Sequence, residues 1–312
     1  MPPWISTGAP CSTPGATSWT EPASPAVTTL LAVPNVSEGR DAAAIAAIAA
    51  AFDAGLLAVH SDPDHHRSVF TLAGVPGELA QAVLNGARVA VERIDLRRHE
   101  GIHPRVGAID VAPIVYREDA DRGAACAEAL VLADRLGAEL GLPVFLYGEL
   151  GAGRTRAQLR RGGPAALAAR IAEGELVPDF GPRTLDPRTG AVLVAARPPL
   201  VAFNVELAPP ATLSQAREIA ALIREGGPEG LPGVRALGLW LEHRGVAQVS
   251  TNVEDHRATS LATLVAAIAR HARPLGAELV APAPAAAFVG FPGDLQVRGR
   301  LTIEHALADK LH

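Results

Sequence analysis

The feature that most constrains the fold of this chain is one order of segments that occurs twice. Between residues 29 and 116, stretches with strand and helix periodicity follow one another as strand, helix, strand, strand, helix, strand. The same order returns between residues 199 and 285. It is the order of the split βαβ unit of ferredoxin-like folds. We therefore expect an α+β protein with two ferredoxin-like βαββαβ subdomains and a substrate groove between them.

The expected elements can be placed by residue range. In the first half we expect strands at 29–36, 56–62, 67–74, 108–116 and 142–148, and helices at 41–55, 78–94, 121–140 and 165–174. In the second half we expect strands at 199–207, 234–242, 245–253 and 277–285, and helices at 214–225 and 260–276. Residues 149–164 read as an arginine-rich loop. Residues 177–192 read as a shaped loop because of their Pro and Gly.

The segment ARPPL at 196–200 separates the two halves, so we expect subdomains at 28–197 and 198–312. Residues 1–27 are rich in Pro, Ser, Thr and Gly, a composition typical of a disordered tail. They lack the basic start and the apolar run of a secretory signal. Together with only two cysteines, this favours a cytoplasmic protein.

Charge and hydrophobicity exclude two kinds of partner. The chain is 48% hydrophobic and 20% charged, which suits a globular protein with a sizeable core. Its net charge is −5, and no cluster of basic residues offers a phosphate-binding face, so we expect no nucleic-acid partner. No apolar run approaches the roughly 20 residues that cross a bilayer, so we expect no membrane partner. Small molecules remain as the expected ligands.

Residues 99–103, HEGIH, match the pattern of zinc proteases, in which two histidines lie one helical turn apart. Pro104 disfavours helical geometry at His103, and Gly101 weakens a helix further. The segment also falls between a predicted helix and a predicted strand. We therefore expect neither a protease nor a metal site here.

His103 itself is a candidate for proton transfer. It precedes Pro104 on a loop of restricted shape, which is how a fold holds a reactive side chain at the edge of a cleft. An imidazole with a pKa near 6.5 transfers protons at neutral pH. A structural or capping role is the alternative. Residues 62–67, DPDHHR, form either a polar turn or a wall of the same site. His243, His256, His271, His305 and His312 have no motif around them and are expected on the surface.

A series of further segments occurs in one order along the chain. They read VPNVSEGRD (33–41), DHHRSVFT (64–71), HEGIHPRVGAIDVAP (99–113), PVFLYGE (143–149), PDFGP (178–182), AFNVEL (202–207) and AQVSTNVED (247–255). In these segments, over about residues 28–285, the chain resembles the glutamate formiminotransferase family. The N-terminal part of the animal bifunctional formiminotransferase–cyclodeaminase belongs to that family. A chain of 312 residues leaves no room for the cyclodeaminase part, so we expect the stand-alone bacterial type.

The resemblance implies two βαββαβ subdomains with folate between them. It implies transfer of the formimino group of N-formimino-L-glutamate to N5 of tetrahydrofolate, the co-substrate, in histidine degradation and one-carbon metabolism. The histidine of the family's H-P-R tripeptide is His103 here, and the resemblance makes it the general acid and base. Ile102 stands where the animal enzymes have an acidic residue. An apolar neighbour of this kind would lower the pKa of His103.

The resemblance also implies a folate-contacting loop, which here consists of Gly181, Pro182, Arg183, Thr184, Leu185, Asp186, Pro187, Arg188, Thr189 and Gly190. Amide and hydroxyl side chains at predicted strand ends suit the edge of a pterin ring, and arginines suit carboxylates. Besides Arg183, the further substrate-binding candidates are Asn35, Asp64, Arg67, Arg105, Asn204, Gln248, Ser250 and Asn252.

Three other functions stay open. Related bacterial proteins act on 5-formyltetrahydrofolate, by formyl transfer or cyclisation. A folate-binding protein without catalysis is a second alternative, and the metalloprotease is the third.

The family is dimeric, and an exposed sheet or helix face in the first half is compatible with a homodimer.

Overall fold

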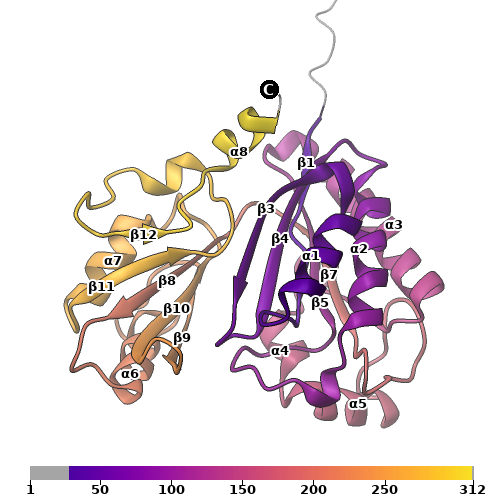
Figure 1. Cartoon of the computed structure of the whole chain (residues 1–312), viewed down its shortest axis with the longest axis horizontal. Coiled ribbons are helices and arrows are strands. Elements are labelled where there is room, and N and C mark those ends of the chain that lie inside the picture. The colour runs from indigo at the N-terminus through magenta and orange to yellow at the C-terminus, as the bar shows by residue number, and fades with distance from the viewer. Residues whose placement is uncertain (1–27, 311–312) are drawn as a thin grey trace, which may run out of the picture.

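The computed structural model describes residues 28–310, and it consists of two sheets, each covered by helices (Figure 1). The expected tail at residues 1–27 lies outside the described residues. We call the seven-stranded sheet with its helices the first subdomain, and the five-stranded sheet with its helices the second subdomain.

The first sheet has the strand order β3-β4-β1/β2-β5-β7-β6. Its strands are β1 (Leu30–Ala32), β2 (Asn35–Val36), β3 (Leu56–Asp62), β4 (Arg67–Gly74), β5 (Ile109–Val115), β6 (Val144–Leu146) and β7 (Val192–Arg197). Because β1 and β2 both pair with β4 and β5, they are one strand interrupted near Pro34, which cannot donate a backbone hydrogen bond. The four strands β3, β4, β1/β2 and β5 have the ferredoxin-like order, and β7 and β6 extend it in parallel.

Helices cover both faces of the first sheet. The helices are α1 (Ala42–Ala51), α2 (Leu79–Arg93), α3 (Arg122–Leu140), α4 (Arg156–Arg160) and α5 (Gly163–Ala172), with short 3₁₀ turns at Asp53–Gly55, Leu96–Arg98 and Asp119–Asp121. α1, α2 and α3 bury the main core on one face. α4 and α5 cover β7 and β6 on the other face through Leu159, Leu167 and Leu193. On the same face, α4 and α5 do not cover β3 and β4, and this part of the sheet faces the second subdomain.

The second sheet has the order β12-β11-β8-β10-β9, which again contains the ferredoxin-like arrangement. Its strands are β8 (Val201–Leu207), β9 (Val234–Leu241), β10 (Val246–Val253), β11 (Pro274–Leu279) and β12 (Val297–Arg298). Its helices are α6 (Leu213–Ile223) and α7 (Leu261–Ala269), followed by a 3₁₀ turn at Ala285–Phe288 and by α8 (Ile303–Lys310). α8 returns to the first sheet, where Ile303 packs on Leu31 and Val115.

The α+β class and the repeated βαββαβ order are confirmed, and four details of the prediction were wrong. The strand β7 was missed, and so was α4, which lies in the stretch expected to be a loop. The last strand begins at Pro274 and not at residue 277, and α7 ends at Ala269 and not at 276. Pro274 explains the shift, because a proline biases the preceding residue toward extended backbone and ends the helix early.

Candidate functional site

The loop that carries His103 leads from the turn after α2 into β5. Residues 99–105 form bends and extended backbone and no helix, so His99 and His103 do not share the helical face that a zinc protease requires. The guanidinium group of Arg105 donates to the carbonyl oxygens of His99 (2.8 Å) and Gly101 (3.2 Å). Arg105, predicted to bind substrate, therefore fastens its own loop.

His99 supports this loop together with His66, which lies in the β3–β4 turn. Their rings stack with centroids 4.2 Å apart. Nδ1 of His66 accepts a hydrogen bond from the backbone N–H of Gly39 at 3.1 Å, and Nε2 of His99 lies 2.9 Å from the carbonyl oxygen of His66. Burial lowers the pKa of both rings, that of His99 to about 4. The two rings are therefore neutral at pH 7 and hold the loop against the turn.

His103 is half-buried and faces His65, whose ring centroid lies 6.1 Å away in an edge-on arrangement. Nδ1 of His103 and Nε2 of His65 are buried, and neither has a hydrogen-bond partner within residues 28–310. Burial first, and then the positive charges of Arg67 and Arg160, hold the pKa of His103 well below its usual 6.5. His103 is therefore an uncharged base at neutral pH with a free ring nitrogen.

Below His103 lies a buried carboxylate that two arginines share. Asp110, on β5, is fully buried, and its Oδ2 contacts Nη1 of Arg67 at 2.6 Å and Nη2 of Arg160. Its Oδ1 accepts the backbone N–H of Val106 at 2.8 Å. Burial raises the pKa of Asp110. The two guanidinium groups and the backbone N–H of Val106 together lower it by more, so that the pKa stays below its usual value. Arg67 also donates from Nε to Oδ1 of Asn35 at 3.1 Å, so both predicted substrate-binding residues have internal partners.

Asp64, another predicted site residue, joins the two subdomains. Its Oδ1 accepts hydrogen bonds from the backbone N–H of His243 (3.1 Å) and lies 2.7 Å from Nδ1 of the same residue. His243 is exposed, as predicted, but it lies in the β9–β10 turn against the buried side chain of Asp64. A second bridge joins Nε2 of His60 on β3 to Oε1 of Glu278 on β11 at 3.5 Å.

Replacing Asp64 with alanine should weaken this connection. The change removes the buried carboxylate that accepts the backbone N–H of His243, and hydrogen bonds to a charged group contribute about 1.5–3 kcal/mol. Chemical denaturation should therefore show a loss of stability of this size for Asp64→Ala. In a double-mutant cycle with His243→Ala, the sum of the stability losses of the two single variants should exceed the loss measured for the double variant. Additive losses would contradict a direct coupling across the subdomains.

The polar candidates of the second subdomain share one face of its sheet. Gln248 is paired with Glu206 and Ser250 with Asn204, while Phe203, Val205 and Val249 enter the core. Asn204, Gln248 and Ser250 lie within their strands rather than at strand ends, which corrects the prediction, whereas Asn252 is the last residue but one of β10. Nδ2 of Asn204 lies 3.3 Å from Oε2 of Glu278. Gln248 is fully buried, and within residues 28–310 neither atom of its amide has a partner.

The loop Gly181–Gly190 begins beside the end of α3 and ends beside the His103 loop. At its start, a Cβ on Gly181 would lie 2.1 Å from the carbonyl oxygen of Leu142. At its end, the backbone N–H of Ala108 donates to Thr189 at 2.8 Å, and Gly190 pairs with Gly107. Arg183, Thr184, Asp186 and Pro187 are exposed. The hydrogen bonds recorded for this loop are made with the first subdomain.

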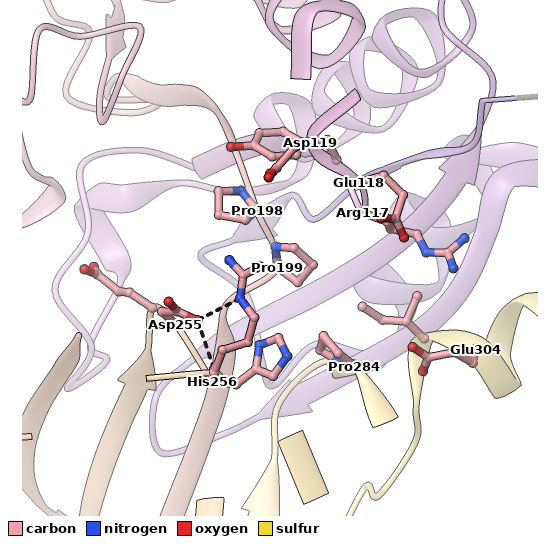
Figure 2. A pocket seen from close by; sticks show the side chains of 13 residues that line it. Arg117, Glu118, Asp119, Pro198, Pro199, Asp255, His256, Pro284 and Glu304 are labelled. Atoms are coloured by element: carbon pink, nitrogen blue, oxygen red, sulfur yellow. Dashed lines mark hydrogen bonds and ion pairs between the residues drawn. The ribbon is translucent and has the colours of Figure 1, made fainter. Parts of the chain in front are cut away.

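A cavity of about 300 Å³ lies between the subdomains, at the linker Pro198–Pro199 (Figure 2). Tyr116 and Asp119 line it from the first subdomain, and Asp255 and His256 from the second. It opens beyond the carboxyl end of β5, whereas His103 precedes the amino end of that strand. At about 3.3 Å per residue, the strand separates the two by roughly 20 Å.

Sequence reasoning missed Arg160 and Arg156, and it considered His65 only as part of the DPDHHR segment. Arg156 and Arg160 lie on α4, and the signal for this helix was present in the segment TRAQ. The side chain of Thr155 caps the backbone N–H of Gln158, and that of Gln158 caps the backbone N–H of Thr155. Among residues 28–310, no helix is long and apolar enough to cross a membrane, and no three His, Cys, Asp or Glu side chains are grouped as metal ligands.

Comparison with known proteins identifies relatives of both subdomains. Residues 29–197 match the family model described as the formiminotransferase domain, N-terminal subdomain, and residues 202–289 match that of the formiminotransferase domain. The chain is 40% identical over 264 residues to a formimidoyltransferase-cyclodeaminase of Sus scrofa, which covers 80% of this chain and 48% of that protein.

Two shorter relatives align over most of their length. A glutamate formimidoyltransferase of Streptococcus pyogenes serotype M1 is 36% identical over 269 residues, which is 82% of this chain and 89% of the relative. One of Thermoplasma acidophilum is 35% identical over 238 residues, which is 73% of this chain and 78% of the relative. The chain thus spans about half the length of the formimidoyltransferase-cyclodeaminase and most of the length of these two.

Proposed function

The chain belongs to the formiminotransferase family, and on that premise we propose that it is a glutamate formimidoyltransferase. It transfers the formimino group of N-formimino-L-glutamate to N5 of tetrahydrofolate, giving 5-formiminotetrahydrofolate and L-glutamate. The observation that carries this proposal is the alignment with two glutamate formimidoyltransferases over most of their length. The uncharged, half-buried base at His103 supports the acid–base chemistry that the transfer needs.

His103 serves as the general base and then as the general acid. N5 of tetrahydrofolate attacks the formimino carbon, and His103 takes the proton that N5 loses. A C–N bond forms, and the tetrahedral adduct then breaks its bond to the glutamate nitrogen while His103 returns the proton to that nitrogen. The low pKa of His103 keeps it ready to accept a proton at pH 7, and Arg105 holds the loop that presents it.

Tetrahydrofolate is the co-substrate, and we assign its pterin to the loop Gly181–Gly190 and to the polar face of the second sheet. The loop Gly181–Gly190 ends beside the His103 loop, which favours it as a folate contact. Gln248 has an amide that is buried and without a partner in the described chain, and an amide both donates and accepts hydrogen bonds to a pterin edge. Asn35, Asn204, Ser250 and Asn252 remain secondary candidates. Arg183 is an exposed candidate for the carboxylates of the folate tail.

The donor decides between this function and its main alternative. Purified chain, treated with a chelator, is given tetrahydrofolate with either N-formimino-L-glutamate or N-formyl-L-glutamate, and product formation is followed by ultraviolet absorbance. A parallel reaction contains 5-formyltetrahydrofolate alone, to test cyclisation. We expect turnover with the formimino donor. Turnover confined to the formyl compounds would replace the proposal by the formyl-directed activity, and folate binding without any turnover would favour a non-catalytic protein.

The pH dependence of the reaction should reflect the low pKa of His103. A general base acts in its neutral form, and its folded-state pKa lies well below 6.5, so the neutral form persists as the pH falls through 6.5. We expect the acid limb of kcat/KM, recorded between pH 4.5 and 9, to have its midpoint below pH 6.5. A midpoint at or above 6.5 would contradict the assignment of His103 as a base whose pKa is lowered by burial and two arginines.

We propose the subdomain limits 28–197 and 198–312, a cytoplasmic location and a homodimer as the working form. The family-model matches, which end at residue 197 and resume at 202, support the limits. Leu130 and Val131 on α3 are exposed apolar side chains and offer part of a contact surface. Sedimentation of the purified chain tests the dimer, and a monomer at micromolar concentration would contradict it.

A further inference from the structure

We propose that Arg156, Arg160 and Arg197, with Tyr147, form a binding site for the two carboxylates of a glutamate unit. The site lies between His103 and the cavity at the linker. The identity of the ligand rests on the proposed function, but the presence of an anion site does not. None of these residues was among the substrate-binding candidates read from the sequence.

The first argument is the balance of buried charge. The side chains of Arg67, Arg156 and Arg160 are only 10%, 18% and 12% exposed. Burial lowers the pKa of Arg67 to about 10, and the neighbouring Arg160 and Arg156 lower it as well. Burial likewise lowers the pKa of Arg197, to which Arg156 adds. The four guanidinium groups are therefore neighbours, and each of them is taken largely out of water.

Too few carboxylates face these arginines. Within residues 28–310, the recorded carboxylate contacts of the four groups are with Asp110, which Arg67 and Arg160 share, and with Glu254, 3.6 Å from Arg156. Glu254 is 41% exposed and lies at the rim. Arg197 donates to the carbonyl oxygen of Pro198 at 3.0 Å. Buried guanidinium groups without matching anions are unfavourable, so a bound anion would stabilise this arrangement.

A second, independent observation is a pair of unused donors. Nε of Arg160 and Nε of Arg197 are buried, and neither has a hydrogen-bond partner within residues 28–310. The Tyr147 hydroxyl is also buried and lies close enough to Arg197 to raise the pKa of that guanidinium group. The guanidinium carbon of Arg156 lies 5.7 Å from the centre of the Tyr147 ring. Buried donors are normally satisfied, and donors of these types match carboxylate oxygens.

The spacing fits two carboxylates of one small molecule. Arg156 and Arg160 are four residues apart on α4, where side chains on one face start about 5–6 Å apart. The two carboxyl carbons of an extended glutamate are separated by four C–C bonds, about 5 Å. Arg160 contacts Asp110, whose other oxygen accepts the backbone N–H of Val106, three residues after His103, and the charge of Arg160 lowers the pKa of His103. A ligand held by Arg160 therefore lies on the His103 side of the site. Glu254 and Pro198, at the other end, line the cavity.

Both substrates of the proposed reaction carry such a glutamate unit, namely the formimino donor and the tail of the folate. The shared chemistry is the α,γ-dicarboxylate, and binding measurements can tell the two sources apart. Titration calorimetry with the full chain uses three probes: L-glutamate, pteroyl-L-glutamate, and pteroate, which lacks the glutamate. The variants are Arg156→Gln, Arg156→Lys and Arg161→Gln. Arg161 is the matched control, since it follows Arg160 in the chain but is 71% exposed.

We expect Arg156→Gln to weaken binding of L-glutamate, of pteroyl-L-glutamate or of both at least tenfold, while pteroate binding is unchanged. Arg156→Lys, which keeps the charge without the planar fork, should fall between. A loss for L-glutamate assigns the site to the donor, and a loss for pteroyl-L-glutamate alone assigns it to the folate tail. Circular dichroism of each variant confirms that it is folded.

Three results would overturn the site. They are no binding of either glutamate compound by the wild-type chain, equal affinities for Arg156→Gln and Arg161→Gln, or an equal loss for pteroate. These binding results do not depend on catalysis. If glutamate binds through Arg156 but no formimino transfer occurs, the site stands and the proposed function falls.

Discussion

Replacing His103 with alanine is expected to lower kcat for formimino transfer by about 10²–10⁴-fold, the usual contribution of a positioned general acid–base group. The variant has no group beside the reacting atoms to take the proton from N5 or to return it to the leaving nitrogen. The KM of both substrates should change little, because the proposed contacts to folate and to carboxylates come from other residues. Initial rates at saturating substrate concentrations measure the effect.

A histidine far from the site provides the control for this experiment. His305 lies on α8, is largely exposed and pairs with Asp309, so His305→Ala should keep the wild-type kcat. Full activity of His103→Ala would remove the catalytic role from His103. A rise in KM with kcat unchanged would instead make it a binding residue.

Replacing Asp110 with asparagine should produce the largest loss of stability, about 3–5 kcal/mol, as expected when one partner of a buried ion pair is removed. The change keeps the shape of the side chain but leaves Arg67 and Arg160 without their shared carboxylate. Unfolding in urea at pH 7 measures the loss. Because the pKa of Asp110 is lowered in the folded chain, its contribution is present above the ordinary carboxyl pKa of 3.8 and is lost as the pH falls below it.

An exposed carboxylate separates this effect from a general effect of lost charge. Glu139 pairs with Arg88 and Arg135 on the surface, and Glu139→Gln should change stability by no more than about 1 kcal/mol. Equal losses for Glu139→Gln and Asp110→Asn would show that the buried ion pairs of Asp110 contribute no more stability than an exposed pair. Asp110→Asn should also raise the KM of the substrate whose glutamate unit binds at the proposed site, since Arg160 loses the contact that positions it there.

The fold was predictable where periodicity was clear. β3 and β4 have the predicted limits, because alternating strands are bounded by the polar DPDHH turn. β7 was missed because Val192–Ala196 is apolar throughout, being buried on both faces between two parallel strands, and it follows a Pro- and Gly-rich loop. α4 has only five residues, too few for a helical period to be visible.

The site was predictable only in its local parts. The break of the false zinc motif follows from Pro104 alone, and the common face of Gln248 and Ser250 follows from strand alternation. Contacts between distant residues could not be read from one sequence. Arg160 meets Asp110 across 50 residues, and His243 meets Asp64 across 179. For this reason Arg67 was expected to be free for substrate, although its charge is paired inside the protein.

The most direct test of the proposed function follows the formimino carbon itself. N-Formimino-L-glutamate labelled with ¹³C in the formimino group is incubated with tetrahydrofolate and the purified chain, and the products are identified by mass spectrometry. The proposal predicts that the label leaves glutamate and appears, mole for mole, on the folate, and that His103→Ala slows this transfer. A label that stays on glutamate, or that is released as formamide or formate without reaching the folate, would contradict it.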